Sequence, residues 1–545
     1  MIHAKIGKLP VANVVLAMVG LYALYFAGLG SYPLVDSDEP VYGQVAKEMA
    51  AGAGWLTPHY DGKPWFDKPP LFYWLSAGCV KLLGSTELAV RLPSAVLAVG
   101  VLVWLYLLVA YDFGRRAAVL ACIAMATCIQ QIVLARAAVT DMTFVFCLAG
   151  SLYAYRRWFG QNGGEQRADS REPRAGNYGL FYPILCGGMA GLAMLAKGPV
   201  GPLLLLVTFA IHLCCSGRLR RLISVDAFMG IAAALIVGMP WYVAMYAVHR
   251  GAFVQGFIVA NNLTRFIKPE HPGTTGGWYS YFLNVPVLFV FFFPWSVFLL
   301  PGLLRYRAAN TGSRLAAVWF AVVFVFFSLS KTQLVTYIFP VYPSAALFVG
   351  VLLDRAASEE SATARCVKVC LITAVAASVL VTAVLVAIAG AKYPAARTPA
   401  ACIGGVLVAA TVVALTQKPD RAALICGTGM VAFASILICS AVPRVAAVVS
   451  TRDIARSVRL GPSDQVAEYG LRRPSLLFYL GFTPRHLRTS DEVKRVLAGN
   501  VSTWVICKDG QTTLVETEGC RIIRKGGFAL IANEAAARRE RLCRK

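Results

Sequence analysis

The sequence predicts an all-α polytopic membrane protein with about thirteen transmembrane helices and a small C-terminal α/β domain. The chain has 545 residues, of which 58% are hydrophobic and 15% are charged, whereas soluble domains are roughly 45–50% apolar and about 25% charged. The apolar residues form blocks of about 20, which is long enough to cross a bilayer as a helix. These blocks lack the two-residue alternation of outer-membrane strands, so a β-barrel is excluded.

The predicted spans follow the apolar blocks in order. They lie at roughly 11–30, 88–110, 117–134, 140–156, 179–196, 199–216, 224–246, 279–303, 315–329, 333–353, 367–390, 400–416 and 422–441. The first block lacks a small-residue cleavage site and is too long for a signal peptide, so we expect a retained helix.

Basic residues predict the orientation of these spans. The net charge of +24 comes from 52 Lys and Arg against 28 Asp and Glu. With the N-terminus in the cytoplasm, the short cytoplasmic connections are the more basic set, as the positive-inside rule requires. An odd number of spans then places the C-terminus in the periplasm. Because this rule accounts for the charge and no basic stripe with interleaved aromatics is present, nucleic acid is not an expected partner.

Two predicted periplasmic loops, at about 31–87 and 247–278, are too long to be simple connectors. Loops of this length are usually functional or disordered. The first loop is rich in aromatic side chains, which argues against disorder and favours packing at the membrane interface. We therefore expect the loops to carry the functional residues.

The composition changes near Val445, which divides the chain into a transmembrane domain, 1–444, and a periplasmic α/β domain, 445–545. In the second domain, four short apolar segments are predicted strands: 475–479, 503–507, 521–524 and 528–532. Segments 490–497 and 534–541 are predicted helices. The sequence leaves open whether Cys507 and Cys520 form a disulfide.

Three acids stand just beyond the first span, at Asp36, Asp38 and Glu39. Clustered like charges bring no structural benefit there, and an aspartate at the interface can act as a general base or hold a cation or an amine. The alternative interpretation is a solvated acidic loop tip.

A second candidate is Lys68, which is followed by Pro69 and Pro70 at a predicted helix start. A lysine at a helix N-terminus can form an anion site, here for a phosphate at headgroup depth. The alternative is a lysine that anchors the helix by extending its amine to lipid headgroups.

Other polar residues carry less weight. We expect Lys197 to be a membrane anchor of this kind, and Lys331 to be either an anchor or part of a phosphate cluster. The outside histidines His59, His249 and His271 are expected to be surface or interface residues.

The stretches that contain these acids and Lys68 resemble a known family. They read DEPVYGQVAKEM (38–49) and GWLTPHYDGKPWFDKPPLFYWL (54–75), and they are similar to the N-terminal signature of bacterial inner-membrane glycosyltransferases of the GT-C class. The similarity is greatest to the ArnT-type lipid A aminoarabinose transferases and the related protein O-mannosyltransferases. It continues, in the family's order and spacing, through AVTDMTF (138–144), MLAKGPVG (194–201), NNLTRF (261–266) and LVTYIFPVYP (334–343).

The resemblance implies a GT-C fold and roles for individual residues. The implied catalytic residues are Asp38, Glu39 and Asp141. The implied donor-phosphate ligands are Lys68, Arg265 and Tyr337. The candidate substrate contacts are Asp67, Asn262, Tyr42 and Lys331.

Three positions depart from the family's pattern. Val41 stands where the closest relatives have Arg, and Asn262 stands where the aminoarabinose transferases have a His that is associated with a metal. Asp67 stands where family members often have Glu. The resemblance therefore leaves open which sugar is transferred and whether a divalent metal binds near Asp38 and Asp67.

The implied activity is transfer of a single sugar, with inversion, from a polyprenyl (undecaprenyl) phosphate donor to a lipid A-type glycolipid at the periplasmic face of the inner membrane. Such an activity modifies lipopolysaccharide and is linked to polymyxin resistance. We expect a monomer surrounded by membrane lipids. A protein O-mannosyltransferase-like activity is the alternative within this class. A lipid-linked sugar transporter or flippase is a weaker alternative, because transporters place polar residues at the bilayer midplane, whereas here the charges gather at one face.

Overall fold

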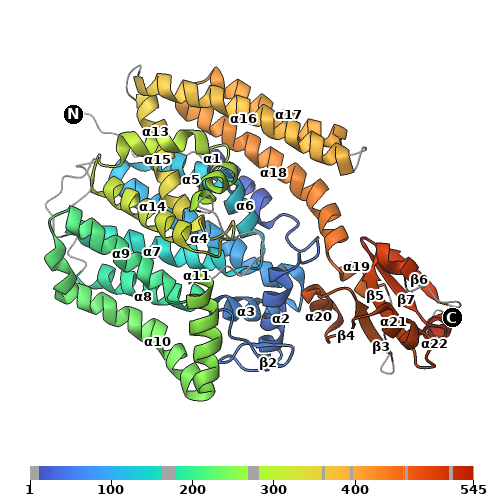
Figure 1. Cartoon of the computed structure of the whole chain (residues 1–545). Helices are drawn as coiled ribbons and strands as arrows, with labels where there is room; N and C mark the ends of the chain where they lie inside the picture. The colour runs from blue at the N-terminus through green and yellow to red at the C-terminus, as the bar shows by residue number, and fades with distance from the viewer. Residues whose placement is uncertain are drawn as a thin grey trace. The chain divides into compact units, whose positions relative to one another are not determined.

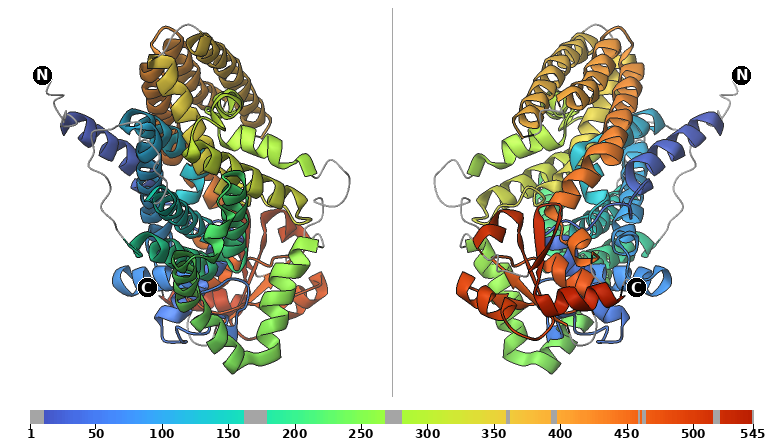
Figure 2. Two further views of the ribbon diagram at one scale, coloured as in Figure 1. Left: turned by 90° about the vertical axis from the view of Figure 1, so that its left-hand side faces the viewer. Right: turned by 90° about the vertical axis from the view of Figure 1, so that its right-hand side faces the viewer.

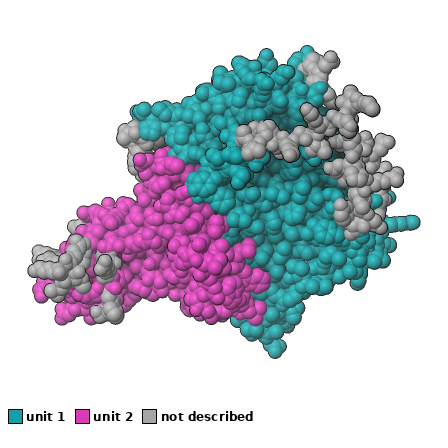
Figure 3. All heavy atoms as spheres, turned by 180° about the vertical axis from the view of Figure 1, so that it is seen from behind, with its two compact units in different colours: residues 1–27, 66–72, 93–437 teal, residues 28–65, 73–92, 438–545 magenta. Residues whose placement is uncertain are grey.

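The structure is a computed structural model that describes residues 11–161, 179–267, 281–358, 362–392, 397–457, 460, 464–514 and 520–543. The chain forms two compact units, which Figure 3 shows in different colours. Unit 1 contains residues 1–27, 66–72 and 93–437, and unit 2 contains residues 28–65, 73–92 and 438–545. The acidic loop and the C-terminal segment, which are far apart in sequence, therefore belong to the same unit.

Unit 1 is helical (Figure 1). Its elements are α1 (Val11–Leu21), η1 (Tyr22–Phe26), α4 (Glu87–Phe113, from residue 93), α5 (Arg115–Thr127), α6 (Ile129–Ala135), α7 (Thr140–Gln161), α8 (Phe181–Lys197), α9 (Val200–Cys215), η2 (Leu219–Ile223), α10 (Val225–Phe253), η3 (Val254–Thr264), α11 (Arg265–Ile267), α12 (Asn284–Phe291), α13 (Ser296–Tyr306), α14 (Thr311–Leu329), η5 (Phe339–Val341), α15 (Tyr342–Ser358), α16 (Ala362–Lys392), α17 (Arg397–Leu415) and α18 (Pro419–Val449, to residue 437). Helix α8 packs between α7 and α10, α16 packs along α17, and α5 packs along α15.

The described residues contain six helices that are long and apolar enough to cross a membrane. They are Glu87–Phe113, Val225–Ile267, Thr311–Leu329, Ala362–Ile388, Arg397–Leu415 and Pro419–Val449. Two bent helix pairs raise the number to eight if each pair is one span, and four shorter apolar helices accompany them. The protein is thus a multi-span helical membrane protein, while the count of thirteen spans stays a prediction.

Several predicted spans and loops have a different shape in the structure. The apolar block 117–134 is two helices, α5 and α6, that meet at 65°, and the block 279–303 contains α12 and α13, which meet at 110°. Residues 247–267, predicted as part of a long loop, are also helical, in the last part of α10, η3 and α11, but a kink at Arg250 (φ 46°, ψ −125°) separates most of them from the preceding part of α10. Hydropathy shows where the chain is apolar, and it does not change at a bend inside an apolar block.

Unit 2 joins the first loop to the C-terminal segment. From the first loop it contains α2 (Asp38–Ala50) and the hairpin of β1 (His59–Tyr60) and β2 (Lys63–Pro64), with most of α3 (Leu71–Leu83). From the C-terminal segment it contains α19 (Arg452–Ala455), α20 (Pro474–Leu480), α21 (Ser490–Leu497), η7 (Asp509–Leu514) and α22 (Glu534–Cys543), together with a sheet. Helix α2 packs against α20.

The C-terminal segment, drawn in orange to red in Figure 2, contains a sheet. This sheet has five strands in the order β4-β3-β5-β7-β6. The strands are β3 (Gln465–Tyr469), β4 (Arg485–Leu487), β5 (Thr503–Lys508), β6 (Arg521–Lys525) and β7 (Phe528–Ala532). Strand β3 pairs in parallel with β4 and β5, and the β5–β7 and β6–β7 pairs are antiparallel. Successive residues of β5 point to opposite faces of the sheet, so Trp504 and Val505 belong to two separate hydrophobic cores.

The prediction of a strand at 475–479 is wrong, because this segment lies inside helix α20. Pro474 is the first residue of the helix, and Gly481 ends it with a positive φ of 83°, as is usual for these residues at helix ends. A short apolar run has no periodicity that separates a strand from a buried helix.

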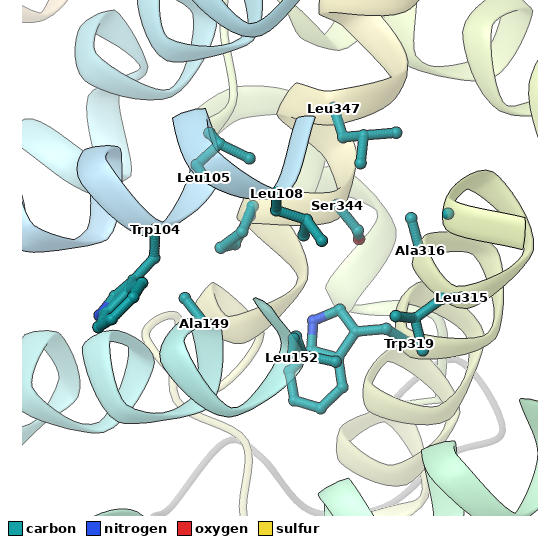
Figure 4. Close-up of a pocket in the computed structure, with 12 residues that line it drawn as sticks. Trp104, Leu105, Leu108, Ala149, Leu152, Leu315, Ala316, Trp319, Ser344 and Leu347 are labelled. Atoms are coloured by element: carbon teal, nitrogen blue, oxygen red, sulfur yellow. The ribbon is translucent and has the colours of Figure 1, made fainter. Parts of the chain in front are cut away.

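A narrow apolar pocket lies between α4, α7, α14 and α15 in unit 1 (Figure 4). Trp104, Leu152, Trp319 and Leu347 are among its lining residues. Its volume is about 20 Å³, which is little more than the space of one water molecule. We interpret it as a packing defect between helices, too small for a polyprenyl chain.

Candidate functional site

Two cations share one carboxylate at the start of α3. Lys68 Nζ lies 3.1 Å from both carboxylate oxygens of Asp67, and Arg265 Nη1 lies 3.1 Å from Asp67 Oδ1. These side chains are largely buried, with exposed fractions of 14% for Lys68 and Asp67 and 25% for Arg265. We call Asp67, Lys68 and Arg265 the shared-carboxylate cluster.

A second ion pair lies near this cluster. Lys197 Nζ is 2.6 Å from Asp141 Oδ1 and 5.0 Å from the centre of the Tyr337 ring. Burial lowers the pKa of Lys68 most, and the positive charges of Arg265 and Lys197 lower this pKa further, against the opposing effect of Asp67. Lys197 therefore lies close enough to act on Lys68 electrostatically, and it is more than the membrane anchor predicted from the sequence.

The shared-carboxylate cluster and the Lys197–Asp141 pair together contain three cations and two carboxylates. These charged groups lie in a poorly hydrated place, where electrostatic attraction is stronger than in water. Such an arrangement can hold a phosphate, because lysine and arginine make short charge-assisted hydrogen bonds to phosphate oxygens. The sequence-predicted residues Asp67, Lys68, Asp141, Arg265 and Tyr337 all contribute to this region of unit 1.

Element η3 holds the segment that carries Asp67 and Lys68. Asn261 Nδ2 donates hydrogen bonds to the Phe66 carbonyl at 3.2 Å and to the Gly256 carbonyl at 2.8 Å. Gly256 lies so close to Phe66 that an added Cβ would be 3.0 Å from Phe66 Cδ2. Asn261 was not predicted from the sequence as a site residue, although it stands in the NNLTRF motif next to Asn262, which was. Element η3 is a π-helix, which is wider than an α-helix, and short π-helical segments are frequent at functional sites.

The neighbouring Asn262 has contacts of its own. Its Nδ2 donates to the Phe257 carbonyl at 2.8 Å, and its Oδ1 would lie 3.1 Å from a Cβ added to Gly198. Gly198 has a positive φ of 95° and directly follows Lys197. Asn262 thus lies against the turn that follows Lys197, and its contact with substrate stays a prediction.

The backbone of Lys331 is hydrogen-bonded to the residue that follows Arg265. Its N–H donates to the Phe266 carbonyl at 3.0 Å, next to Arg265. Its amine donates to Tyr281 Oη at 2.7 Å and lies over the Tyr281 ring. The Lys331 side chain therefore has an aromatic partner, and the two predictions for it, anchor or phosphate ligand, both stay open.

The three acids of the first loop, in unit 2, have three different environments. Asp36 is 2% exposed in its side chain and accepts hydrogen bonds from Ser475 N at 2.9 Å and Ser475 Oγ at 2.6 Å. Burial raises the pKa of Asp36, and the Ser475 hydrogen bonds and the Arg473 charge oppose this rise. Asp38, by contrast, is exposed at the first turn of α2 and accepts a hydrogen bond from Ser37 Oγ at 2.9 Å.

Glu39 is buried in a bidentate ion pair. Arg91 Nε and Nη2 each lie 2.8 Å from one oxygen of Glu39, and the Val35 N–H donates to the same carboxylate at 2.9 Å. This geometry favours a structural role for Glu39 over the catalytic role predicted from the sequence. Tyr42 is also buried and contacts the Tyr73 ring edge to face at 5.8 Å, so it packs in the interior of unit 2.

The three histidines predicted to be surface or interface residues belong to different parts of the chain. His249 packs against the Phe66 ring at 5.1 Å, His59 belongs to the β1–β2 hairpin, and His271 lies outside the described residues. Across the part of the chain that the structure describes, no group of three or more His, Cys, Asp or Glu side chains could hold a metal ion.

Comparison with known proteins confirms the resemblance that the motifs indicated. Residues 67–243 match the family model of the dolichyl-phosphate-mannose-protein mannosyltransferases. The fold is that of ArnT from Cupriavidus metallidurans, solved as a crystal structure bound to undecaprenyl phosphate, with a TM-score of 0.79 at 21% identity over 96% of this chain and 98% of that one.

Curated relatives are similar over part of their length. The undecaprenyl phosphate-α-4-amino-4-deoxy-L-arabinose arabinosyl transferase 1 of Pseudomonas fluorescens (strain Pf0-1) is 28% identical over 347 residues, which cover 63% of this chain and 58% of that protein. The corresponding transferase of Pseudomonas aeruginosa (strain UCBPP-PA14) is 29% identical over 344 residues, 62% of this chain and 58% of that protein. The similarity thus spans less than two thirds of these relatives.

Proposed function

We propose that this protein is an inverting glycosyltransferase that moves a single sugar from undecaprenyl phosphate to a lipid A-type glycolipid. The observation that carries the proposal is the largely buried cluster in which Lys68 and Arg265 share Asp67, close to the Lys197–Asp141 pair. The names of the relatives, and the undecaprenyl phosphate bound to the protein with the same fold, supply the substrate class.

The proposed reaction needs cations where the donor phosphate leaves. The bond between C1 of the sugar and the phosphate oxygen breaks while an acceptor oxygen bonds to C1 from the opposite side. The electron pair leaves with the polyprenyl phosphate, and Lys68 and Arg265 stabilise the charge that develops on it. Fixed charges of this kind contribute several kcal/mol, or about 10²–10³ in rate for one donor group.

We assign to Asp38 the positioning of the acceptor. An acceptor phosphate is already ionised near neutral pH, so the proposed reaction removes no proton from it. A hydroxyl acceptor would instead give its proton to Asp38 as the general base. The exposure of Asp38, beside two buried acids, supports this assignment.

The finer topology is part of the proposal. We place thirteen spans in the bacterial inner membrane, the N-terminus in the cytoplasm and the 445–545 region in the periplasm as an α/β domain. The loop charges support this orientation. We further propose that the enzyme works as a monomer.

One observation favours a second candidate function. The match of residues 67–243 to the protein mannosyltransferase model makes a protein O-mannosyltransferase-like activity the alternative. The two functions differ in the acceptor, a glycolipid in one case and a protein hydroxyl in the other.

The test combines cells and purified protein. Mass spectrometry of lipid A and of total protein glycans, from cells with and without the gene, should show a single added sugar on lipid A. Purified enzyme in nanodiscs should transfer sugar to lipid A from one of two donors, undecaprenyl phosphate-4-amino-4-deoxy-L-arabinose or polyprenyl phosphate-mannose. The donor that supports transfer identifies the sugar. A modified protein with unmodified lipid A would replace the first proposal with the alternative.

A further inference from the structure

We propose that Asp36, through Ser475 of the C-terminal segment, is a positioning residue that fixes Asp38 for the reaction. This inference rests on the proposed function, in which Asp38 acts on the acceptor. It goes further by giving the C-terminal segment a direct part in arranging the acidic loop. All the residues that carry the argument belong to unit 2.

Asp38 stands between two immobilised carboxylates. On one side, the Asp36 side chain is bound by Ser475 through both its backbone N–H and its hydroxyl. On the other side, Glu39 is held by Arg91, whose side chain has no exposed surface. A short backbone segment that is fixed two residues before and one residue after Asp38 has little freedom to move its N-terminal helical turn.

The Ser475 contact is itself supported from behind. The Ser475 hydroxyl lies 2.8 Å from the Thr451 hydroxyl, and both side chains are completely buried. Because a serine has one hydroxyl proton and it is directed to Asp36, Thr451 must be the donor in this second hydrogen bond. The chain Thr451–Ser475–Asp36 therefore has a defined direction, which ends on the carboxylate.

Helix α20 contacts the first loop at two further points. The Tyr479 hydroxyl accepts a hydrogen bond from the Leu34 N–H at 2.8 Å and donates one to Glu87 at 3.2 Å. Lys47, near the end of α2, donates to the Phe478 carbonyl at 3.1 Å. These contacts lie before and after the Asp36–Ser475 link, so α20 supports the whole approach to Asp38.

Arg91 makes the other side rigid. Besides Glu39, it donates hydrogen bonds to the carbonyls of Leu29, Tyr32 and Pro33 at 2.8–3.0 Å. These carbonyls belong to the irregular chain before α2, which has no regular backbone pairing, and buried carbonyls need such partners. One guanidinium therefore organises the backbone that leads to Asp38.

The experiment separates a positioning acid from the acid that acts on the acceptor. Asp36→Asn keeps an oxygen for the Ser475 N–H and an amide that can donate to the Ser475 hydroxyl, so it should retain most of kcat. Asp36→Ala and Ser475→Ala should lower kcat by about tenfold or more, since an ångström-scale misplacement can cost about 10²-fold. The Kd for undecaprenyl phosphate should stay within about twofold of the wild-type value, because misplacing Asp38 leaves the donor ligands in place. Asp38→Asn should abolish transfer.

A matched control is Ser502→Ala, which removes the same hydroxyl from a comparable pair elsewhere in unit 2. Ser502 Oγ donates to Asp464 Oδ1 at 2.5 Å, and the control should leave kcat unchanged. Hydrogen–deuterium exchange provides a readout that does not require turnover. Amides of residues 34–42 should exchange faster in Asp36→Ala and Ser475→Ala than in the wild type, with Asp36→Asn close to the wild type.

Each outcome decides one of the two claims. Wild-type kcat and wild-type exchange in Ser475→Ala would overturn the positioning role, as would an Asp36→Asn variant that is as inactive as Asp38→Asn. If the wild-type enzyme transferred no sugar from either donor, the proposed function would fail, and the exchange data would still report whether Ser475 orders the loop. Thermal unfolding of each variant identifies any that does not fold, and the conservative Asp36→Asn then decides the question.

Discussion

At the scale of single residues, variants of Lys68 test whether this side chain binds the donor phosphate or only anchors a helix in the membrane. Lys68→Ala should raise the Kd for undecaprenyl phosphate and slow turnover, because loss of one hydrogen bond to a charged group costs roughly 1.5–3 kcal/mol, about one to two orders of magnitude. Lys68→Arg should keep only part of the wild-type affinity and turnover, since a planar guanidinium does not replace a compact ammonium beside Asp67. Donor titration in nanodiscs measures both, and full activity in Lys68→Ala would return this residue to the anchor interpretation.

The pH dependence of donor binding gives a second test of the same residue. Burial and the nearby Arg265 and Lys197 lower the pKa of Lys68, and only the protonated amine attracts a phosphate. The lysine is charged below its pKa, so donor affinity should fall as pH rises through a value lower than that of an ordinary lysine. In Lys68→Arg this alkaline loss should disappear, because a guanidinium stays protonated. The measurement is the donor Kd at a series of alkaline pH values, and identical profiles for the two proteins would contradict the assignment.

The buried ion pair between Arg91 and Glu39 should contribute to the stability of the fold. Removing one partner of a buried ion pair leaves an uncompensated charge, so Glu39→Gln or Arg91→Met should each cost about 3–5 kcal/mol, and the double variant should be less destabilised than the sum. Thermal unfolding of the four proteins in one detergent forms the cycle. Additive effects would mean that the two side chains do not depend on one another.

At the scale of elements, glycines allow α8 and α10 to pack closely. Gly187 and Gly191 are four residues apart on α8, and a Cβ added to Gly187 would lie 1.7 Å from the Gly230 carbonyl oxygen on α10. Small residues with this spacing let membrane helices approach one another. Because α8 ends at Lys197, this packing also supports the residue that pairs with Asp141.

The corresponding prediction compares two adjacent glycines. Gly187→Ala forces the two backbones apart and should lower the unfolding temperature and the yield of folded protein, since overpacking costs about 1–3 kcal/mol. Gly188→Ala meets no atom within 4 Å, and it should be neutral or slightly stabilising. Thermal unfolding in detergent compares them, and equal behaviour of the two variants would show that the α8–α10 approach is looser than described.

Elements with a clear apolar signal could be predicted from the sequence, and bends could not. Helices α14, α16, α17 and α18 coincide with predicted spans, and strands β5, β6 and β7 coincide with predicted strands. The breaks at Cys128 and around Phe293 fall inside continuous apolar blocks, where hydropathy does not change. Segment 475–479 was assigned to the wrong type of element because its neighbours, Pro474 and Gly481, were not used as helix ends.

At the scale of the whole molecule, the motifs located much of the candidate site although its residues are scattered. Asp67, Asp141, Arg265 and Tyr337 came from four separate motifs. What the sequence did not reveal is which partner each residue has. A lysine at a span end is usually an anchor, so the sequence alone does not reveal that Lys197 pairs with Asp141. The resemblance implies a catalytic role for Glu39, and nothing in the sequence reveals that its carboxylate pairs with Arg91, which is 52 residues away.

The orientation of the chain gives the last prediction. The basic connections place the N-terminus in the cytoplasm, and the proposed reaction uses a donor at the periplasmic face, so the C-terminal segment that contacts the acidic loop must also be periplasmic. Alkaline phosphatase, which folds only where disulfides form, should therefore be active when fused after Lys545 and silent when inserted at Gly163, two positions outside the described residues. The reverse pattern would place Asp38 and the sheet in the cytoplasm, where lipid A of the outer leaflet is out of reach, and both the topology and the acceptor would have to be abandoned.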